Sequence, residues 1–231
     1  MFPKTDRLLA VLQFADGLFP AGGFAHSFGL EVYAQRGVVR DRAGLEAFVR
    51  AHLEGSAGPG DAAAAACAAR FASAGDLQAC LELDDRLGAM KWVPELRAAS
   101  RQMGRHTARA AVALGDDTFV ARLACVVDEA RTPGHHAVVF GAVTGRHGAD
   151  PEMAAAAFLH STVVLLVNAG LRLLPIGQLD GQRVLAALRP LLASLAAQAA
   201  RAGPEDLWGF TPGLEIAGCR HADLEMRLFR S

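Results

Sequence analysis

The sequence predicts an all-α protein, and its composition carries most of that prediction. The two strong helix formers Ala and Leu supply 47 and 30 of the 231 residues. Only 6% of residues are aromatic, whereas strands favour aromatic and β-branched side chains. The hydrophobic fraction of 52% is ample for a core. No long polar linker marks a boundary, so we expect residues 1–231 to form a single compact domain of about ten helices, with little or no β-structure.

Capping residues and chain breaks divide the sequence into these helices. An Asp before a helix, or a Pro at its first position, opens it, and Gly or Pro closes it. Openings are predicted at Asp6, Asp41, Asp61, Asp76, Pro94, Asp117 and Asp150. Breaks are predicted at residues 17–23, 37, 58–60, 75, 132–134, 175–177 and 203–204. Between these points apolar residues recur every three or four positions, which is the helical period.

The pattern makes four further predictions. In the first helix the apolar positions are Leu8, Leu9, Leu12 and Ala15. After the Pro-Gly break, Phe24, Phe28 and Val32 begin a helical stripe that ends near Gly37. Pro190 lies inside the stripe from Val184 to Leu195, which predicts a kink or a split at Arg189. Beyond Gly203 the helical pattern fades, and residues 221–229 are predicted to form the last short helix.

Charge and motif content exclude nucleotide and nucleic-acid chemistry. The net charge of −1 lacks the basic excess that nucleic-acid binding normally needs. Of the 23 basic residues only Lys4 and Lys91 are lysines, and neither follows the glycines of a phosphate-binding loop. No G-x-G-x-x-G pattern follows a strand either. We therefore expect no bound cofactor.

No residue pattern predicts a catalytic or metal site. The cysteines lack C-x-x-C spacing, and apolar neighbours predict that Cys67 and Cys125 are buried. His135 and His136 are adjacent, so on a helix their side chains diverge by about 100° and cannot share an ion unaided. The His26-Ser27 pair lacks the geometry of a nucleophile and its base. No acidic residue is flanked by apolar sequence that would raise its pKa, so we predict that the protein is not an enzyme.

Two apolar segments resemble membrane or export signals. Residues 8–15 follow two basic residues as in a signal peptide, but Gln13, Asp16 and the lack of a cleavage site argue against one. Residues 153–171 carry no formal charge over nearly the length of a membrane span. They contain His160 and Asn168 and follow a capped start, which favours a buried central helix. We expect a cytoplasmic protein that does not contact a membrane.

The C-terminal residues mix arginines with large apolar side chains, as the core of a protein interface does. The mixture comprises Arg220, His221, Leu224, Met226, Arg227, Leu228, Phe229 and Arg230. A terminal helix that folds back on its own domain would show the same composition, and both alternatives stay open. The Pro-Gly-Gly loop before Phe24 is likewise either an interface or a tight corner.

Five sequence blocks, in order along the chain, resemble the urease accessory protein UreF family. They are LQFADGLFPAGGFAHSFGLE at 12–31, SRQMGR at 100–105, HHAVVFGAVTG at 135–145, VNAGLRLLPIGQLDGQRVL at 167–185 and RHADLEMRLFRS at 220–231. The resemblance spans essentially the whole chain. It implies a single-domain helical bundle, commonly a homodimer, which agrees with the fold expected from composition.

The resemblance implies a role as a scaffold in urease maturation. Proteins of this family assemble with a UreD (or UreH) partner and with the GTPase UreG, and that complex delivers nickel to apo-urease. The nucleotide chemistry would then belong to the partner, in keeping with the missing phosphate-loop lysine. The alternatives are that the chain carries nickel itself, through histidines such as His135 or His136 that cluster in space, or that one of its arginines activates the GTPase.

The resemblance implies that the N-terminal block and the C-terminal tail bind partner proteins. The residues implied are Gly22, Gly23, Phe24, His26 and Ser27 in the block, and Arg220, His221, Leu224, Arg227, Leu228, Phe229 and Arg230 in the tail. We expect residues 1–23 and 204–231 to be mobile or ordered by a partner. Deletion of residues 220–231 is accordingly expected to leave a folded protein that does not bind the UreD-type partner.

Overall fold

The computed structural model describes residues 4–230 and is all-helical over that range, as the composition predicts. Its α-helices are α1 (Lys4–Ala15), α2 (Leu30–Gln35), α3 (Arg42–His52), α4 (Ala63–Ser73), α5 (Leu77–Met90), α6 (Pro94–Leu114), α7 (Thr118–Asp128), α8 (His136–Arg146), α9 (Pro151–Leu173), α10 (Gln178–Ala199) and α11 (Pro212–His221). Short 3₁₀ turns lie at Gly23–Ala25 and Pro204–Asp206, and a π-helical segment spans Leu53–Ala62. The described residues contain no strand.

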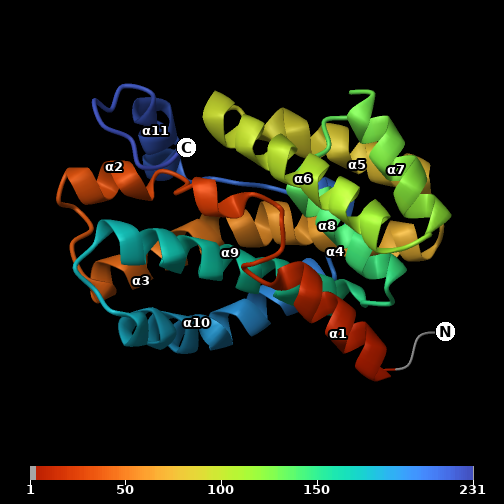
Figure 1. Ribbon diagram of the computed structural model, residues 1–231, viewed down its shortest axis with the longest axis horizontal. Helices are drawn as coiled ribbons and strands as arrows, with labels where there is room; N and C mark the ends of the chain where they lie inside the picture. Colours follow the sequence, from red (N-terminus) through yellow and green to blue (C-terminus); the bar gives the residue numbers. More distant parts are fainter. Residues whose placement is uncertain (1–3, 231) are drawn as a thin grey trace.

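Three helices, α4, α8 and α9, form the centre of the bundle (Figure 1). Helices α6 and α7 cover α8, and α5 packs against α4. Helix α10 runs beside α9, and α3 packs against both of them. Helix α1 also packs against α9. Helix α11 returns the end of the chain to α2, so that segments from both ends of the sequence lie side by side.

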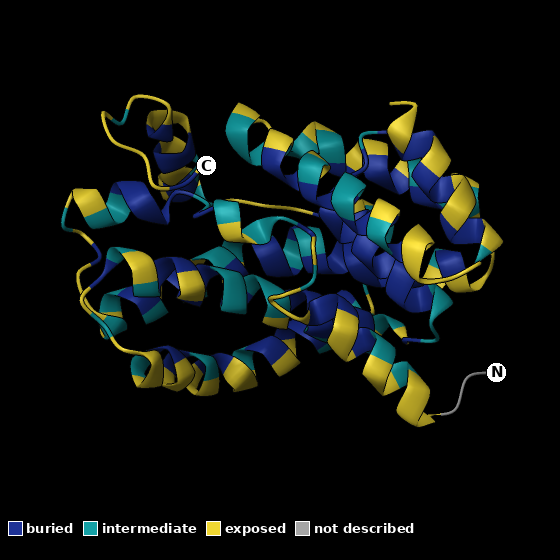
Figure 2. Cartoon of the chain, in the orientation of Figure 1, coloured by how far each residue is buried: buried dark blue, intermediate teal, exposed yellow. Residues whose placement is uncertain are grey.

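The centre is built from small residues that let helices approach closely. Every residue of α4 from Ala63 to Ala69 is buried, as is every residue of α8 from His136 to Gly145 (Figure 2). A Cβ on Gly141 would lie 2.1 Å from the carbonyl oxygen of Ala65, and one on Gly145 would lie 2.5 Å from that of Ala69. The contact between α4 and α8 therefore depends on glycine, because any side chain there would enter the facing backbone.

Helix α9 is the long apolar helix that the sequence placed in the core. Within the described residues it alone has the length and composition of a membrane span, with a mean hydropathy of 1.7. Half of that apolar window is buried inside the fold, where α9 contacts α10, α4 and α8. The core helix of a soluble protein meets the same criteria, and these contacts identify α9 as such a helix.

The first helix forms at its predicted place but turns another face inward. Its buried residues are Val11, Phe14 and Ala15, whereas Leu8, Leu9 and Leu12 are each about half exposed. The spacing of Leu8 and Leu12 is helical, so periodicity alone does not say which of two apolar stripes meets the core. Of the N-terminal segment expected to be mobile or partner-ordered, residues 1–3 lie outside the described residues.

The predicted loop at residues 58–60 is instead a π-helical segment that joins α3 to α4. The wider π turn accommodates Pro59, which has no N–H to donate. Its glycines are needed for packing, because a Cβ on Gly55 would lie 2.9 Å from the Phe210 carbonyl oxygen. Phe210 lies in the irregular segment 207–211, and its N–H donates to the Gly55 carbonyl at 2.7 Å. Glycine and proline here mark close packing rather than a chain break.

Three further expectations about local structure are wrong in whole or in part. Of the kink or split predicted at Arg189, the split does not occur, because helix α10 continues through Pro190. The last helix is Pro212–His221, which a proline opens, and residues 222–230 form turns and bends rather than a helix. Cys67 is buried as predicted, but Cys125 is exposed on α7.

A buried carboxylate that the sequence analysis did not predict fixes the start of α8. Asp84 is 2% exposed and lies on the inward face of α5 with Cys80 and Leu87. It accepts hydrogen bonds from the Thr132 hydroxyl at 2.6 Å, the Gly134 N–H at 2.6 Å and the His135 N–H at 2.8 Å. Burial raises the pKa of Asp84, and the three donors oppose that shift. The sequence did contain a signal of this burial, because Cys80 and Leu87 lie four positions before and three positions after Asp84, on the same face of the helix.

We expect Gly141→Ala to destabilise the protein by about 2 kcal/mol or more, because the added methyl overlaps the Ala65 carbonyl and must separate α4 from α8. Urea denaturation measures the free energy of unfolding. Gly115→Ala is the matched control, since its backbone is extended and nothing lies within 4 Å of the added Cβ. Equal unfolding free energies for the two variants would contradict this account of the helix contact.

Candidate functional site

The N-terminal block and the C-terminal tail meet beside α2. Helix α11 packs against α2, and the Arg230 N–H donates to the Ala25 carbonyl at 2.8 Å. This approach requires a glycine at position 29, where φ is +85° and an added Cβ would lie 3.3 Å from the Ala217 Cβ. Two of the segments that the sequence singled out therefore form one continuous surface, although nearly two hundred residues separate them.

A buried carboxylate on α2 holds the tail in this place. Glu31 is 1% exposed, and its Oε1 accepts the Leu228 N–H at 2.7 Å. Its Oε2 accepts the Phe229 N–H at 3.2 Å and lies 3.0 Å from His221 Nε2. An ionised carboxylate has the lone pairs for all three contacts, and hydrogen bonds to a charged group contribute about 1.5–3 kcal/mol each.

His221 lies between two carboxylates and links them. It is fully buried, with Nε2 on Glu31 and Nδ1 2.8 Å from Glu95 Oε2. Each ring nitrogen therefore faces a carboxylate oxygen at hydrogen-bonding distance. Arg227 pairs with the other oxygen of Glu95 at 3.2 Å. These four residues are here called the Glu31 cluster.

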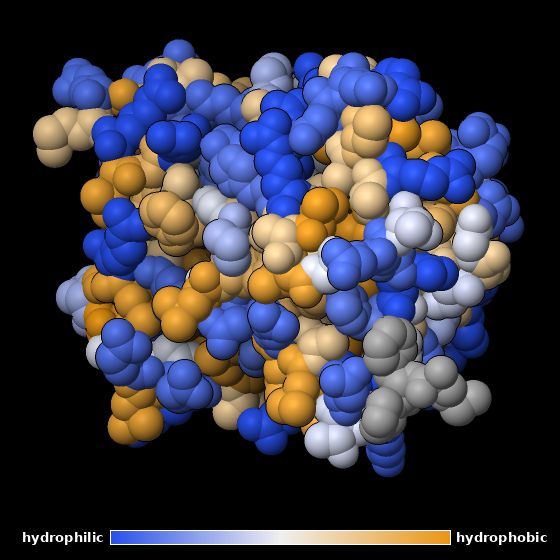
Figure 3. All heavy atoms as spheres, turned by 45° about the vertical axis from the view of Figure 1, so that its right-hand side comes forward, coloured by the Kyte–Doolittle hydropathy of each residue, from blue (hydrophilic) through white to orange (hydrophobic). Residues whose placement is uncertain are grey.

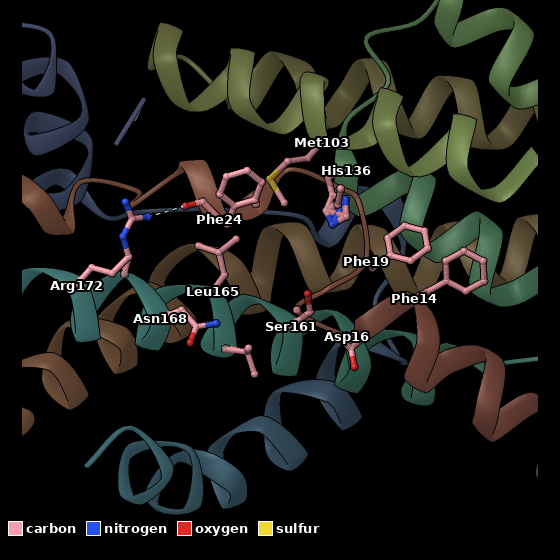
Figure 4. A pocket seen from close by; sticks show the side chains of 15 residues that line it. Phe14, Asp16, Phe19, Phe24, Met103, His136, Ser161, Leu165, Asn168 and Arg172 are labelled. Carbon is pink, nitrogen blue, oxygen red and sulfur yellow. Dashed lines mark hydrogen bonds between the residues drawn. The ribbon is translucent and has the colours of Figure 1, made fainter. Parts of the chain in front are cut away.

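Arg172 of α9 joins the tail to the N-terminal block from a second direction. Its guanidinium lies 4.3 Å from the centre of the Phe229 ring, within range of a cation–π interaction. The same side chain donates to the Phe24 carbonyl at 3.2 Å, as the dashed line in Figure 4 shows. Phe229 is 4% exposed as a result. One arginine thereby contacts both segments.

A pocket opens beside the N-terminal block, between its loop and helices α6 and α9 (Figure 4). Phe24 lies at its rim and is 76% exposed, whereas Met103 and Leu165 lie deeper between the helices. A Cβ on Gly23 would lie 2.6 Å from Leu165 Cδ1, so a larger residue there would force the Leu165 side chain to shift. His136 also lines the pocket and a second, adjoining one.

Four histidines near these pockets, three of them buried and one partly buried, are held neutral. Burial lowers the pKa of His26, His52 and His136 to about 4. Burial likewise lowers the pKa of His135 to about 3, and its Nδ1 lies 3.1 Å from the Ser100 hydroxyl. The two adjacent histidines, His135 and His136, occupy the first turn of α8 with hydroxyl neighbours rather than carboxylates. Within residues 4–230 no group of three or more His, Cys, Asp or Glu side chains is arranged to hold a metal ion.

The structure divides the predicted partner-binding residues into buried and exposed sets. His26, Ser27, His221 and Phe229 are buried, and Gly22, Gly23 and Leu224 are partly buried. Phe24, Arg220, Arg227, Leu228 and Arg230 are exposed. All of these residues lie on or beside the joined segments. Ser231, the last residue of the tail, is outside the described residues.

Three residues that organise this site were not among those predicted. Glu31, Glu95 and Arg172 supply its carboxylates and its bridging guanidinium. A signal for Glu31 was available, because it stands between the apolar residues Leu30 and Val32, which are both buried. Nothing in the local sequence of Glu95 or Arg172 identifies their distant partners.

Comparison with known proteins places this all-helical chain among accessory proteins rather than enzymes. The UreF family model matches residues 39–189. The chain is 34% identical to the urease accessory protein UreF of Bacillus sp. (strain TB-90), over 98% of this chain and 100% of that protein. It is 36% identical to the UreF of Rhodopseudomonas palustris (strain BisA53), over 92% of this chain and 88% of the relative. The chain belongs to the UreF family of urease accessory proteins, as its sequence blocks predicted.

We expect Glu31→Gln to release the tail, because an amide oxygen cannot replace the charged acceptor of two backbone N–H groups and His221. Hydrogen exchange at Leu228 and Phe229 should accelerate by about tenfold or more, as measured by NMR or mass spectrometry. Glu225→Gln is the control, since Glu225 is exposed. Unchanged protection of both amides in the Glu31 variant would show that the carboxylate does not hold the tail.

Stability should fall as pH decreases from 6.5 towards 5. The unfolded chain protonates these four histidines near pH 6.5, whereas the folded chain keeps them neutral to about pH 4. The unfolded state therefore binds more protons, at a cost of up to about 1.4 kcal/mol per pH unit for each histidine. Urea denaturation at pH 7.5, 6 and 5 checks this slope, and His52→Gln should make it shallower. A free energy of unfolding independent of pH over that range would refute the assignment.

Proposed function

We propose that this protein acts as a scaffold in urease maturation, binding a UreD/UreH-type accessory protein and recruiting or regulating a UreG-type GTPase so that nickel enters apo-urease. Family membership over nearly the whole chain supports this role. The chain itself has no phosphate-binding loop, so the nucleotide chemistry belongs to the partner. Nickel is cargo in this proposal, and the chain acts in the cytoplasm as a homodimer.

The observation that carries the proposal is the joined surface of the N-terminal block and the tail. Phe24 and Leu228 expose 76% and 52% of their surface there, and Met226 exposes 81%. Arg220 and Arg230 are exposed on the same tail. Exposed large apolar side chains together with arginines are typical of the well-packed centre of a protein interface.

A partner that covers this surface gains from both kinds of side chain. Burying Phe24 and Leu228 removes apolar area from water, at roughly 25 cal/mol per Å². Arg220 and Arg230 can pair with carboxylates of the partner through two parallel hydrogen bonds each. The Glu31 cluster lowers the entropic cost of docking, because it holds the tail in place before the partner arrives. This differs from a tail that becomes ordered only on binding.

Substitution at exposed positions tests the proposal better than deletion of the tail. Removing residues 220–231 would leave the buried Glu31 carboxylate without its donors, and folding and binding would both change. The variants Phe24→Ser and Leu228→Asp change side chains that are exposed, while every backbone donor to Glu31 remains.

We expect each variant to bind the UreD/UreH-type partner at least about tenfold more weakly, a loss of about 1.4 kcal/mol, measured by co-purification and biolayer interferometry. Leu179→Asp is the matched control, since Leu179 is 64% exposed at the start of α10. Wild-type affinity of both tail and block variants would contradict the proposed surface. A wild-type chain that binds neither accessory protein would contradict the proposed function itself.

A further inference from the structure

Helix α6 carries four arginines at four-residue spacing. They are Arg97, Arg101, Arg105 and Arg109, here called the arginine ridge. Residues four apart on a helix are neighbours, about 6 Å apart along the axis, so these side chains form one continuous row. Such rows incline by about 26° to the helix axis and are the ridges by which one helix packs against another.

The ridge has much less negative charge around it than positive charge within it. Asp128 at the end of α7 pairs with Arg109 at 3.0 Å and lies 4.0 Å from Arg105. Arg101 donates to the Pro133 carbonyl at 3.1 Å, which is a neutral acceptor. Within residues 4–230 the Arg97 side chain has no ion pair. Like charges at this spacing repel one another. The positive charges of Arg97 and Arg101, in the half of the ridge nearer the start of α6, are therefore not offset by a paired carboxylate.

Two acidic residues close in sequence to Arg97 or to Asp128 are already engaged elsewhere. Glu95, two residues before Arg97, pairs with His221 and Arg227 in the Glu31 cluster. Glu129, next to Asp128, pairs with Arg131 at 2.6 Å. The ridge is thus a local excess of positive charge on a chain whose net charge is −1. Hydrophilic side chains, with some apolar ones among them, cover the upper part of the face in Figure 3.

The face of α6 beside the ridge is fixed against the core, and Arg97 and Arg105 are themselves partly buried, so the ridge is held in one orientation. Met103, Gly104 and Thr107 are buried where α6 packs on α8. A Cβ on Gly104 would lie 2.0 Å from the Gly134 carbonyl oxygen, which shows how closely the two backbones approach. A rigid helix that presents charges at fixed spacing loses little conformational entropy when a partner binds.

We propose that the arginine ridge is a docking surface for an acidic helix of a partner protein, with carboxylates at the same four-residue spacing. Matching ridges of two helices interdigitate, and each guanidinium can hold a carboxylate through two hydrogen bonds. A second copy of this chain does not supply such a helix, because no two of its 24 acidic residues lie four apart in the sequence. The partner is therefore a different protein, and the identification of that protein as a urease maturation component rests on the function proposed above.

The ridge is separate in chemistry from the surface around Phe24 and Leu228. That surface is apolar with arginines at its edge, whereas the ridge is a row of charge with a buried apolar side. The two surfaces together allow the scaffold to hold two proteins at once, one through burial of apolar area and one through charge. Binding at the ridge should consequently weaken with salt, which screens exposed charges beyond roughly 8–10 Å at physiological ionic strength.

A synthetic helical peptide with four glutamates at four-residue spacing is the probe, and the same peptide with glutamines is its control. We expect the full chain to bind the glutamate peptide at low salt at least about tenfold more tightly than the glutamine peptide, by calorimetry. Arg97→Glu/Arg101→Glu should lose that preference. Arg122→Glu/Arg189→Glu makes the same change of net charge at exposed positions on α7 and α10, and should keep it.

Arg97→Gln alone guards against a folding defect, because it leaves the contact of Arg101 with Pro133 intact. This variant should bind the glutamate peptide measurably more weakly than the wild-type chain, and its melting temperature should be unchanged. The proposal is overturned if the chain binds both peptides equally, or if the ridge and control variants behave alike. Binding of the same variants to the UreD/UreH-type and UreG-type proteins then identifies which partner uses the ridge. A wild-type chain that binds the glutamate peptide but neither accessory protein would count against the proposed function and not against the ridge.

Discussion

The carboxylate of Glu31 is the interaction on which the candidate site depends. It is almost completely buried, and an ionised group in that position is tolerated only when donors surround it. Those donors come from residues 221, 228 and 229, at the far end of the chain. The cost of burying the carboxylate thereby becomes a constraint on the tail, because the donors that offset this cost lie on the tail.

This constraint connects the rest of the architecture. Helix α11 brings His221 to α2, and α6 brings Glu95 to the other side of the imidazole ring. Arg172 on α9 then covers Phe229 and holds the Phe24 carbonyl. Helices from three parts of the bundle therefore meet at one cluster. Because α9 is itself packed in the centre between α4, α8 and α10, the surface formed by the two segments is fixed to the core rather than to a loose end.

Composition and capping were sufficient for the fold class and for most helix starts. The Asp41, Asp76, Asp117 and Asp150 side chains cap α3, α5, α7 and α9 as the sequence predicts. Periodicity failed where two apolar stripes competed, as in α1, and where glycines served packing, as in the π-helical segment. Sequence identified both the N-terminal block and the tail. It did not show that they contact each other, because the pairing of Glu31 with His221 is a contact between residues 190 positions apart.

Glu31 and His221 should stabilise the fold through each other, and a double-mutant cycle measures this coupling. Urea denaturation of wild type, Glu31→Gln, His221→Gln and the double variant gives the coupling free energy between the two residues. The account predicts a coupling of about 1 kcal/mol or more, with the double variant less destabilised than the sum of the single variants. Additive effects of the two substitutions would contradict it, and would mean that the tail is held in place by something other than the buried carboxylate.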